Sequence, residues 1–153
     1  VIAHAPAAPL RTQASTALPL LSQWLQGAAA TAPTSLAALR LLLGVLAVTR
    51  DLLGPIADEQ PADLAGLLPV WLQLLAALDG GGGGGLVAAA RLLALEAALE
   101  CIGAARGLPY YAIYPHKRAV LQALKQPLDH RKRAVRQAAA RCVNQWHLLK
   151  PQR

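Results

Sequence analysis

Residues 127–149 read PLDHRKRAVRQAAARCVNQWHLL, and this stretch decides the fold. Its apolar residues alternate at spacings of four and three, which places them on one narrow stripe of an α-helix. The stripe consists of Val135, Ala139, Cys142, Trp146 and Leu149. The opposite face is polar and contains Arg133, Arg136, Asn144 and His147. The pattern predicts a helix over Pro127–Leu149 that packs one face against other helices, with Asp129 as its N-terminal cap.

The composition of the whole chain of 153 residues favours an all-α fold. Alanine and leucine dominate and are strong helix formers, whereas the β-branched residues that favour strands are scarce. The length suits one domain that buries about two-thirds of its unfolded surface. Because the first residue is valine rather than methionine, we expect the chain to be part of a longer protein.

An apolar fraction of 55% raises the question of a membrane-spanning helix. The most apolar stretch, Leu64–Leu78, contains Pro69 and Gln73 and is shorter than the about 20 residues that a span needs. Leu36–Val48 is shorter still and contains Arg40. Both are therefore predicted to be buried helices. No basic segment followed by an apolar run opens the chain, so no secretory signal is visible.

Proline, glycine and capping residues divide the chain into six helices in three pairs. The pairs cover residues 15–50, 62–105 and 114–149. Residues 1–14 are predicted to be a flexible lead-in, with Ser15 or Thr16 capping the first helix. The six glycines of Gly80–Gly85 are followed by Leu86-Val87, not by the Lys-Ser/Thr of a phosphate-binding loop. We interpret this run as a flexible turn.

Other single residues are predicted to bound the helices. The first helix is expected to end at Gly27, and the second to begin at a cap formed by Thr34 or Ser35. Pro69 is predicted to kink the third helix, because proline removes a backbone donor and its ring clashes with the preceding turn. For the same reason, Pro127 is predicted to end the fifth helix.

Charge is divided unequally along the chain. Residues 1–100 carry four basic and seven acidic side chains, a net charge of −3, whereas residues 101–153 carry eleven basic and one acidic, a net charge of +10. Such polarity predicts that the C-terminal third docks an acidic partner, either protein or nucleic acid. A solvated basic face is the alternative interpretation of the same charges.

All three tyrosines lie within residues 110–114, in the sequence Tyr-Tyr-Ala-Ile-Tyr. One interpretation is a packed loop between repeats, whose rings cover the ends of helices. The other is a binding surface, because tyrosine and arginine are enriched at the residues that dominate interface affinity.

Residues that could carry chemistry are dispersed. Neither Cys101 nor Cys142 has a second cysteine at metal-ligand spacing, so each is predicted to be a small buried side chain in a reducing compartment. A disulfide between them is a further possibility that nothing in the sequence supports. The histidines are expected at the surface: His4, His116, His130 and His147. Without a nucleophile–base pair or a close carboxylate pair, the sequence predicts no enzyme, cofactor or metal site.

Helix pairs that repeat about every 40–47 residues are typical of HEAT and armadillo solenoids. No pair can bury its apolar faces alone, so neighbouring pairs stack into a continuous two-layer core. The predicted fold is therefore an all-α solenoid of HEAT-type antiparallel helix pairs, with about three repeats and six helices.

The last pair also resembles a known family, the MMS19 family. The resemblance covers about residues 108–149 and rests on five segments: Tyr114–Lys117, Val120–Leu124, Pro127–Arg133, Val135-Arg136 with Ala139, and Trp146–Leu149. The family is the large HEAT-repeat protein of the cytosolic iron–sulfur assembly targeting complex, also described as a nucleotide-excision-repair and transcription protein. The chain departs from the family at His130, where a second acidic residue is usual, and at Gln137-Ala138. The run of six glycines is a further departure.

The resemblance implies an adaptor in cytoplasm and nucleus that docks iron–sulfur assembly components and apo iron–sulfur client proteins. It also implies that Asp129 and Arg136 tie successive repeats, and Trp146 is expected to pack the last helix. The residues predicted to contact partners are Tyr110, Tyr111, Lys117, Arg118, Arg131, Lys132, Arg133 and Arg136. Nucleic-acid binding through the same basic helix is the alternative, although no base-reading motif is present.

Overall fold

The computed structural model describes residues 7–31, 35–53, 61–79 and 85–149. Every regular element in these ranges is helical, which confirms the predicted all-α class. The α-helices are α1 (Ala7–Thr31), α2 (Leu36–Leu52), α3 (Pro61–Ala65), α4 (Leu67–Asp79), α5 (Gly85–Ala104), α6 (Tyr110–Ile113), α7 (Lys117–Ala123), α8 (Lys125–Leu128) and α9 (Arg133–His147). The 3₁₀-helices are η2 (Ala105–Gly107) and η3 (Tyr114–His116).

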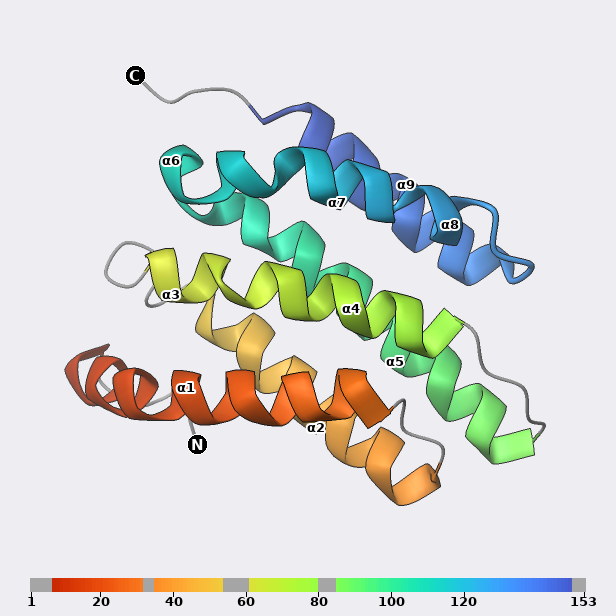
Figure 1. Cartoon of the computed structure of the whole chain (residues 1–153), viewed down its shortest axis with the longest axis horizontal. Helices are drawn as coiled ribbons and strands as arrows, with labels where there is room; N and C mark the ends of the chain where they lie inside the picture. Colours follow the sequence, from red (N-terminus) through yellow and green to blue (C-terminus); the bar gives the residue numbers. More distant parts are fainter. Residues whose placement is uncertain (1–6, 32–34, 54–60, 80–84, 150–153) are drawn as a thin grey trace.

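The helices form two layers (Figure 1). One layer consists of α1, then α3 with α4, then α6 to α8, and the second layer consists of α2, α5 and α9. Each helix of the first layer pairs with the helix of the second layer that follows it in the chain, and neighbouring pairs stack side by side. This arrangement confirms the predicted HEAT-type solenoid of about three repeats.

The core runs without interruption through all three pairs, and α5 lies at its centre, against α2, α4 and α9. At the contact with α9, the indole Nε1 of Trp146 donates a hydrogen bond to the carbonyl of Ile102 at 2.9 Å. Ile102 lies in the last turn of α5, where carbonyl groups lose their intrahelical partners. Trp71 of α4 is equally buried, but its Nε1 has no hydrogen-bond partner among the residues that the structure describes.

The contact between α2 and α5 centres on the carbonyl of Leu46. The Thr49 hydroxyl donates to this carbonyl at 2.9 Å, and the Cys101 thiol of α5 donates to it at 3.3 Å. Arg50 and Glu100 form an ion pair at the exposed rim of the same contact. Exposed pairs contribute at most about 1 kcal/mol, so the buried residues supply most of the stabilisation here.

Two prolines shift helix boundaries away from their predicted positions. The kink predicted at Pro69 is a break before it, between α3 and α4, and the helix end predicted at Pro127 is wrong because α8 continues through it. In both cases the preceding helix ends four residues before the proline, at Ala65 and Ala123. The pyrrolidine ring clashes with the carbonyl at that position. Each proline then lies in the first turn of the next helix, where its missing N–H costs nothing.

The first helix is longer than predicted. It begins at Ala7, so residues 7–14 are helical rather than a flexible lead-in, and it passes through the predicted end at Gly27 to reach Thr31. Glycine inside a helix costs only about 1 kcal/mol relative to alanine. Burial of Leu25 in the core offsets that cost, so packing overrides the local stop signal.

The start of the second helix agrees with one of its two predicted caps. Ser35 is the N-cap of α2, and its hydroxyl accepts a hydrogen bond from the Ala38 N–H at 3.1 Å. The alternative cap, Thr34, lies outside the described residues, as do residues 1–6 with His4 and most of the glycine run.

The apolar stretch that raised the membrane question lies in the core. By length and composition alone, Pro61–Leu78 could cross a membrane, with 18 residues and a mean hydropathy of 1.5. The structure breaks this stretch at Gly66 and buries half of it inside the protein, against α1, α5 and α7. The buried-helix interpretation of Leu64–Leu78 therefore agrees with the structure.

The two buried tryptophans offer a matched test of the α5–α9 contact. We expect Trp146→Phe to lower the free energy of unfolding by about 1–2 kcal/mol more than Trp71→Phe, because only the first change removes a buried hydrogen bond. Urea unfolding followed by circular dichroism measures both values. Equal losses for the two variants would show that the Trp146–Ile102 bond contributes nothing.

Candidate functional site

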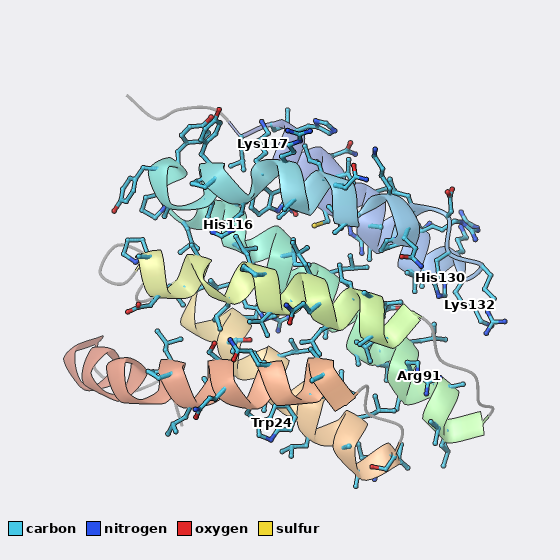
Figure 2. All side chains as sticks on the ribbon, viewed as in Figure 1. Trp24, Arg91, His116, Lys117, His130 and Lys132 are labelled. Atoms are coloured by element: carbon cyan, nitrogen blue, oxygen red, sulfur yellow. The ribbon has the colours of Figure 1, made fainter. Side chains whose placement is uncertain are left out.

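The residues predicted to contact partners fall into two groups at opposite ends of the last helix pair. Figure 2 shows Lys117 near the start of α7 and Lys132 in the turn before α9. The helical stretch Lys117–Leu128 separates the groups by roughly 17 Å, at a rise of 1.5 Å per residue. We call Tyr110, Tyr111, Tyr114, Lys117 and Arg118 the aromatic end. We call His130, Arg131, Lys132 and Arg133 the basic turn.

The aromatic end is helical rather than a loop. α6 and η3 carry the tyrosines, and the rings of Tyr110 and Tyr114 pack with centroids 5.1 Å apart and planes tilted by 34°. Tyr110 is half-buried, whereas Tyr111 and Tyr114 are 72% and 58% exposed. Exposed rings offer a partner apolar area together with hydroxyl groups, at little cost in side-chain entropy. This geometry favours the binding-surface interpretation of the tyrosine cluster.

An open groove of about 550 Å³ continues from the aromatic end along one side of α7. It is lined by Tyr114, Pro115, Lys117, Arg118, Leu121, Gln122 and Lys125. Among the residues that the groove adds to the predicted site are Tyr114, Leu121 and Lys125. Leu121 was predicted to face inward and is half-buried, at the boundary between core and groove. The spacing of 114, 118, 121 and 125 along one helix face is the signal that could have found these residues.

Charge in the groove has one sign. Its ionisable residues are Lys117, Arg118 and Lys125, and none of them forms an ion pair with another described residue. His116 lies on the other side of the helix, facing α3 and α4 (Figure 2). The groove therefore presents three cations around an apolar floor, which electrostatically favours an anionic partner.

The basic turn is held in shape by its own hydrogen bonds. The Lys132 N–H donates to Nδ1 of His130 at 3.0 Å, and the Arg136 guanidinium donates to the carbonyls of His130 and Arg131 at 2.7 and 2.9 Å. The side chains of Arg131 and Lys132 are exposed, as is that of Arg133. Three adjacent cations thus project from a turn whose backbone Arg136 fixes.

One prediction for this turn is wrong. Asp129 is the C-cap of α8, not the N-cap of the last helix, which begins at Arg133 after the N-cap Lys132. Arg136 was expected to tie repeats together with Asp129, and its guanidinium donates hydrogen bonds to backbone carbonyls of its own turn. Arg136 therefore positions the turn, while its side chain is exposed and its contact with a partner stays a prediction. Trp146, by contrast, lies buried between α9 and α5.

The two cysteines are buried free thiols. Burial raises the pKa of each to about 12 from an ordinary value of 9.0, and for Cys101 the hydrogen bond with Thr49 opposes this shift in part. Because the thiolate is both the nucleophile and the metal ligand, neither thiol is suited to catalysis or metal binding near neutral pH. Across the described residues, no three His, Cys, Asp or Glu side chains gather as a metal site would require.

A second groove, of about 290 Å³, lies where α5 and α9 cross. Its rim carries the paired Arg50 and Glu100, so charge there is partly balanced. At Gly103, a Cβ atom would lie 2.5 Å from Oε1 of Gln145, the far end of a flexible side chain, and at ordinary contact distance from Sγ of Cys142. This groove has no exposed aromatic residue and no excess of one charge comparable to the groove along α7.

The stacked antiparallel helix pairs make this a helical-repeat protein of the HEAT type. Its last pair carries a cationic and aromatic surface. About a third of the chain matches curated proteins named MMS19 nucleotide excision repair protein homolog. Identity is 45% over 51 residues for Arabidopsis thaliana, 46% over 52 residues for Xenopus tropicalis and 43% over 53 residues for Homo sapiens. Over this stretch the chain is similar to the MMS19 family, which confirms the resemblance for this part of the chain.

The match is partial on both sides. It covers 33–35% of this chain and only 4–5% of the length of each relative. No protein-family profile matches the chain.

The buried thiols lead to a prediction about reactivity and alkaline stability. At pH 8 we expect Ellman's reagent to label the native protein at least roughly tenfold more slowly than the protein in urea, because burial disfavours the reactive thiolate.

Above pH 9 the unfolded chain loses thiol protons that the folded protein keeps until about pH 12, so the free energy of unfolding falls as pH rises through this window. Urea titrations at pH 8 and 10 measure this loss. The loss of stability between pH 8 and pH 10 should be smaller in the C101A/C142A variant. An unchanged loss in that variant would show that the two thiols do not cause it.

Arg136 can be tested against its neighbour Arg133, which is also exposed. We expect Arg136→Ala to lower the free energy of unfolding by about 1 kcal/mol and to speed amide exchange at Lys132, because two charge-assisted hydrogen bonds are lost. Arg133→Ala should change both by much less. Thermal unfolding and hydrogen-exchange NMR measure the difference, and indistinguishable variants would remove the positioning role of Arg136.

Proposed function

We propose that this chain is a non-enzymatic adaptor module of the cytosolic iron–sulfur protein assembly targeting complex. In this role it docks assembly partners and serves the delivery of clusters to apo iron–sulfur proteins of DNA replication, repair and transcription, in cytoplasm and nucleus. The observation that carries the proposal is the surface of the last pair, where cations and exposed tyrosines lie on a chain of which about a third is similar to MMS19 homologues.

The chemistry of that surface suits protein docking. Tyrosine and arginine dominate affinity at protein interfaces when they lie close together and lose water on binding. The aromatic end supplies both residue types, with Arg118 next to the exposed Tyr114 in the groove. The basic turn, roughly 17 Å away along α7 and α8, adds charge that would speed encounter with an acidic partner.

Nucleic-acid binding is the second candidate, and the basic turn is the observation that favours it. Arg131, Lys132 and Arg133 are adjacent and exposed, as phosphate-binding residues often are. Binding of this kind would weaken steeply with salt, because each neutralised phosphate releases counterions. We rank it second because the groove and the tyrosines lie at the other end of the pair.

Co-precipitation of the purified chain with the family's assembly partners tests the proposal. We expect R131E/K132E/R133E and K117E/R118E each to reduce capture at least about fivefold, because both groups carry charge toward the partner. R40E/R141E, a matched reversal of two exposed arginines away from both groups, should leave capture within about twofold.

Capture that persists unchanged in both variants would remove this surface from the proposed function. Titration of labelled single-stranded and duplex DNA at two salt concentrations runs in parallel. Tight, salt-sensitive DNA binding that is lost in R131E/K132E/R133E, together with no capture of partners, would favour the nucleic-acid alternative.

A further inference from the structure

The groove along α7 lies on the edge of its layer. In the described part of the chain, α4 packs against one side of α7, and α9 packs beneath it in the second layer. His116 marks the side facing α3 and α4, whereas Lys117 lies on the far side (Figure 2). The groove therefore occupies the position where a further helix of the first layer would stack on α7.

The composition of this edge differs from that of an ordinary hydrated helix face. Charges of mixed sign would be enough to keep such a face in water. Here the charges are all positive, and the half-buried Leu121 lies between them. The one acidic residue among residues 101–153, Asp129, lies beyond the groove at the end of α8.

The spacing of these residues matches a helix. Arg118 and Lys125 are seven residues apart on one face, a separation of roughly 10.5 Å, or two helical turns. Leu121 lies between them, three residues from one and four from the other. A second helix packed parallel or antiparallel to α7 presents residues at the same intervals, so two carboxylates seven residues apart would meet the two cations.

We propose that this groove binds an acidic amphipathic helix of a partner protein, laid along α7 as the next helix of the layer. The helix has carboxylates at positions i and i+7, and a bulky apolar side chain between them that covers Leu121. Its contact extends over about three turns, the length from Tyr114 to Lys125. The inference rests on the proposed adaptor function and names the chemistry of the partner.

Charge complementarity favours this occupant over a second copy of the chain. Two copies that joined through this edge would bring the same three cations face to face. The first helix pair is no better a match, because its exposed charges on α2 are Arg40, Arg50 and Asp51, of which Arg50 is already paired. Among the described residues, neither surface of a second copy offers two carboxylates seven residues apart on one helix face, as the groove requires.

A designed peptide tests the proposal directly. The probe is a fluorescein-labelled helical 15-residue peptide with glutamates at i and i+7 and leucines at i+3 and i+4, on an alanine and glutamine background. The control peptide has the same composition, with the glutamates moved to the opposite face. We expect the full chain to bind the first peptide at least about tenfold more tightly than the control, by fluorescence anisotropy in low salt.

Variants locate the binding. R118E/K125E should weaken binding at least about tenfold, whereas R131E/K132E, an equal change of charge in the basic turn, should stay within about threefold. Leu121→Ser should also weaken binding. Because Leu121 is half-buried, circular dichroism and thermal unfolding check that this variant is folded. If Leu121→Ser does not fold, R118E/K125E still tests the groove, because both of these residues are exposed.

Three results would overturn the proposal: equal binding of the two peptides, no binding of either, or equal effects of the two charge-reversal variants. Phosphatidylserine vesicles or duplex DNA that bind more tightly than the peptide, and through Arg118 and Lys125, would also overturn it.

The experiments distinguish failure of this inference from failure of the proposed function. If assembly partners are captured but the peptide does not bind, only this inference is lost. If the peptide binds but no partner is captured, the groove keeps its specificity and the adaptor function fails.

Discussion

The rest of the structure depends on the packing of α5 on three sides. Cys101 bonds to the Leu46 carbonyl of α2, while its neighbour Ile102 accepts a hydrogen bond from Trp146 of α9. Successive residues of a helix point about 100° apart, so one turn of α5 reaches the first pair and the last pair at once. No single pair could bury these faces alone, which is why the three pairs are stable only as a stack.

The same constraint explains where a partner can bind. α4 lies between two neighbours in its layer, α1 and α7, and packs against both. Leu67, Val70 and Leu74 of α4 are accordingly buried. Among the described helices, α7 has a neighbour in its layer on one side only, with Val120 and Leu124 facing the core. None of the described pairs stacks on its other side, where the groove lies. Binding along α7 would repeat the packing that holds the pairs together.

Periodicity made the fold predictable, whereas the helix ends depended on packing. The stripe from Val135 to Trp146 predicted an inward helix face correctly, because spacings of three and four depend on helix geometry alone. Gly27 and Pro127 were read as stops, although a local cost of about 1 kcal/mol at glycine is easily offset by burial. Asp129 does not cap the last helix, because that helix begins four residues later, at Arg133, and Asp129 instead ends α8.

The candidate site was predictable in composition but not in arrangement. Lys117 and Lys132 belong to the same excess of positive charge in the sequence, yet the helical stretch of α7 and α8 places them at opposite ends of one pair. Counting charges in the sequence does not show how far apart they lie. In the structure, the helical stretch between the two groups separates them by roughly 17 Å. Because both groups lie on one folded helix pair, a partner that met both would gain the second contact with less further loss of entropy. Under the proposed adaptor function, the last pair would then select partners by the spacing of their acidic groups as well as by their charge.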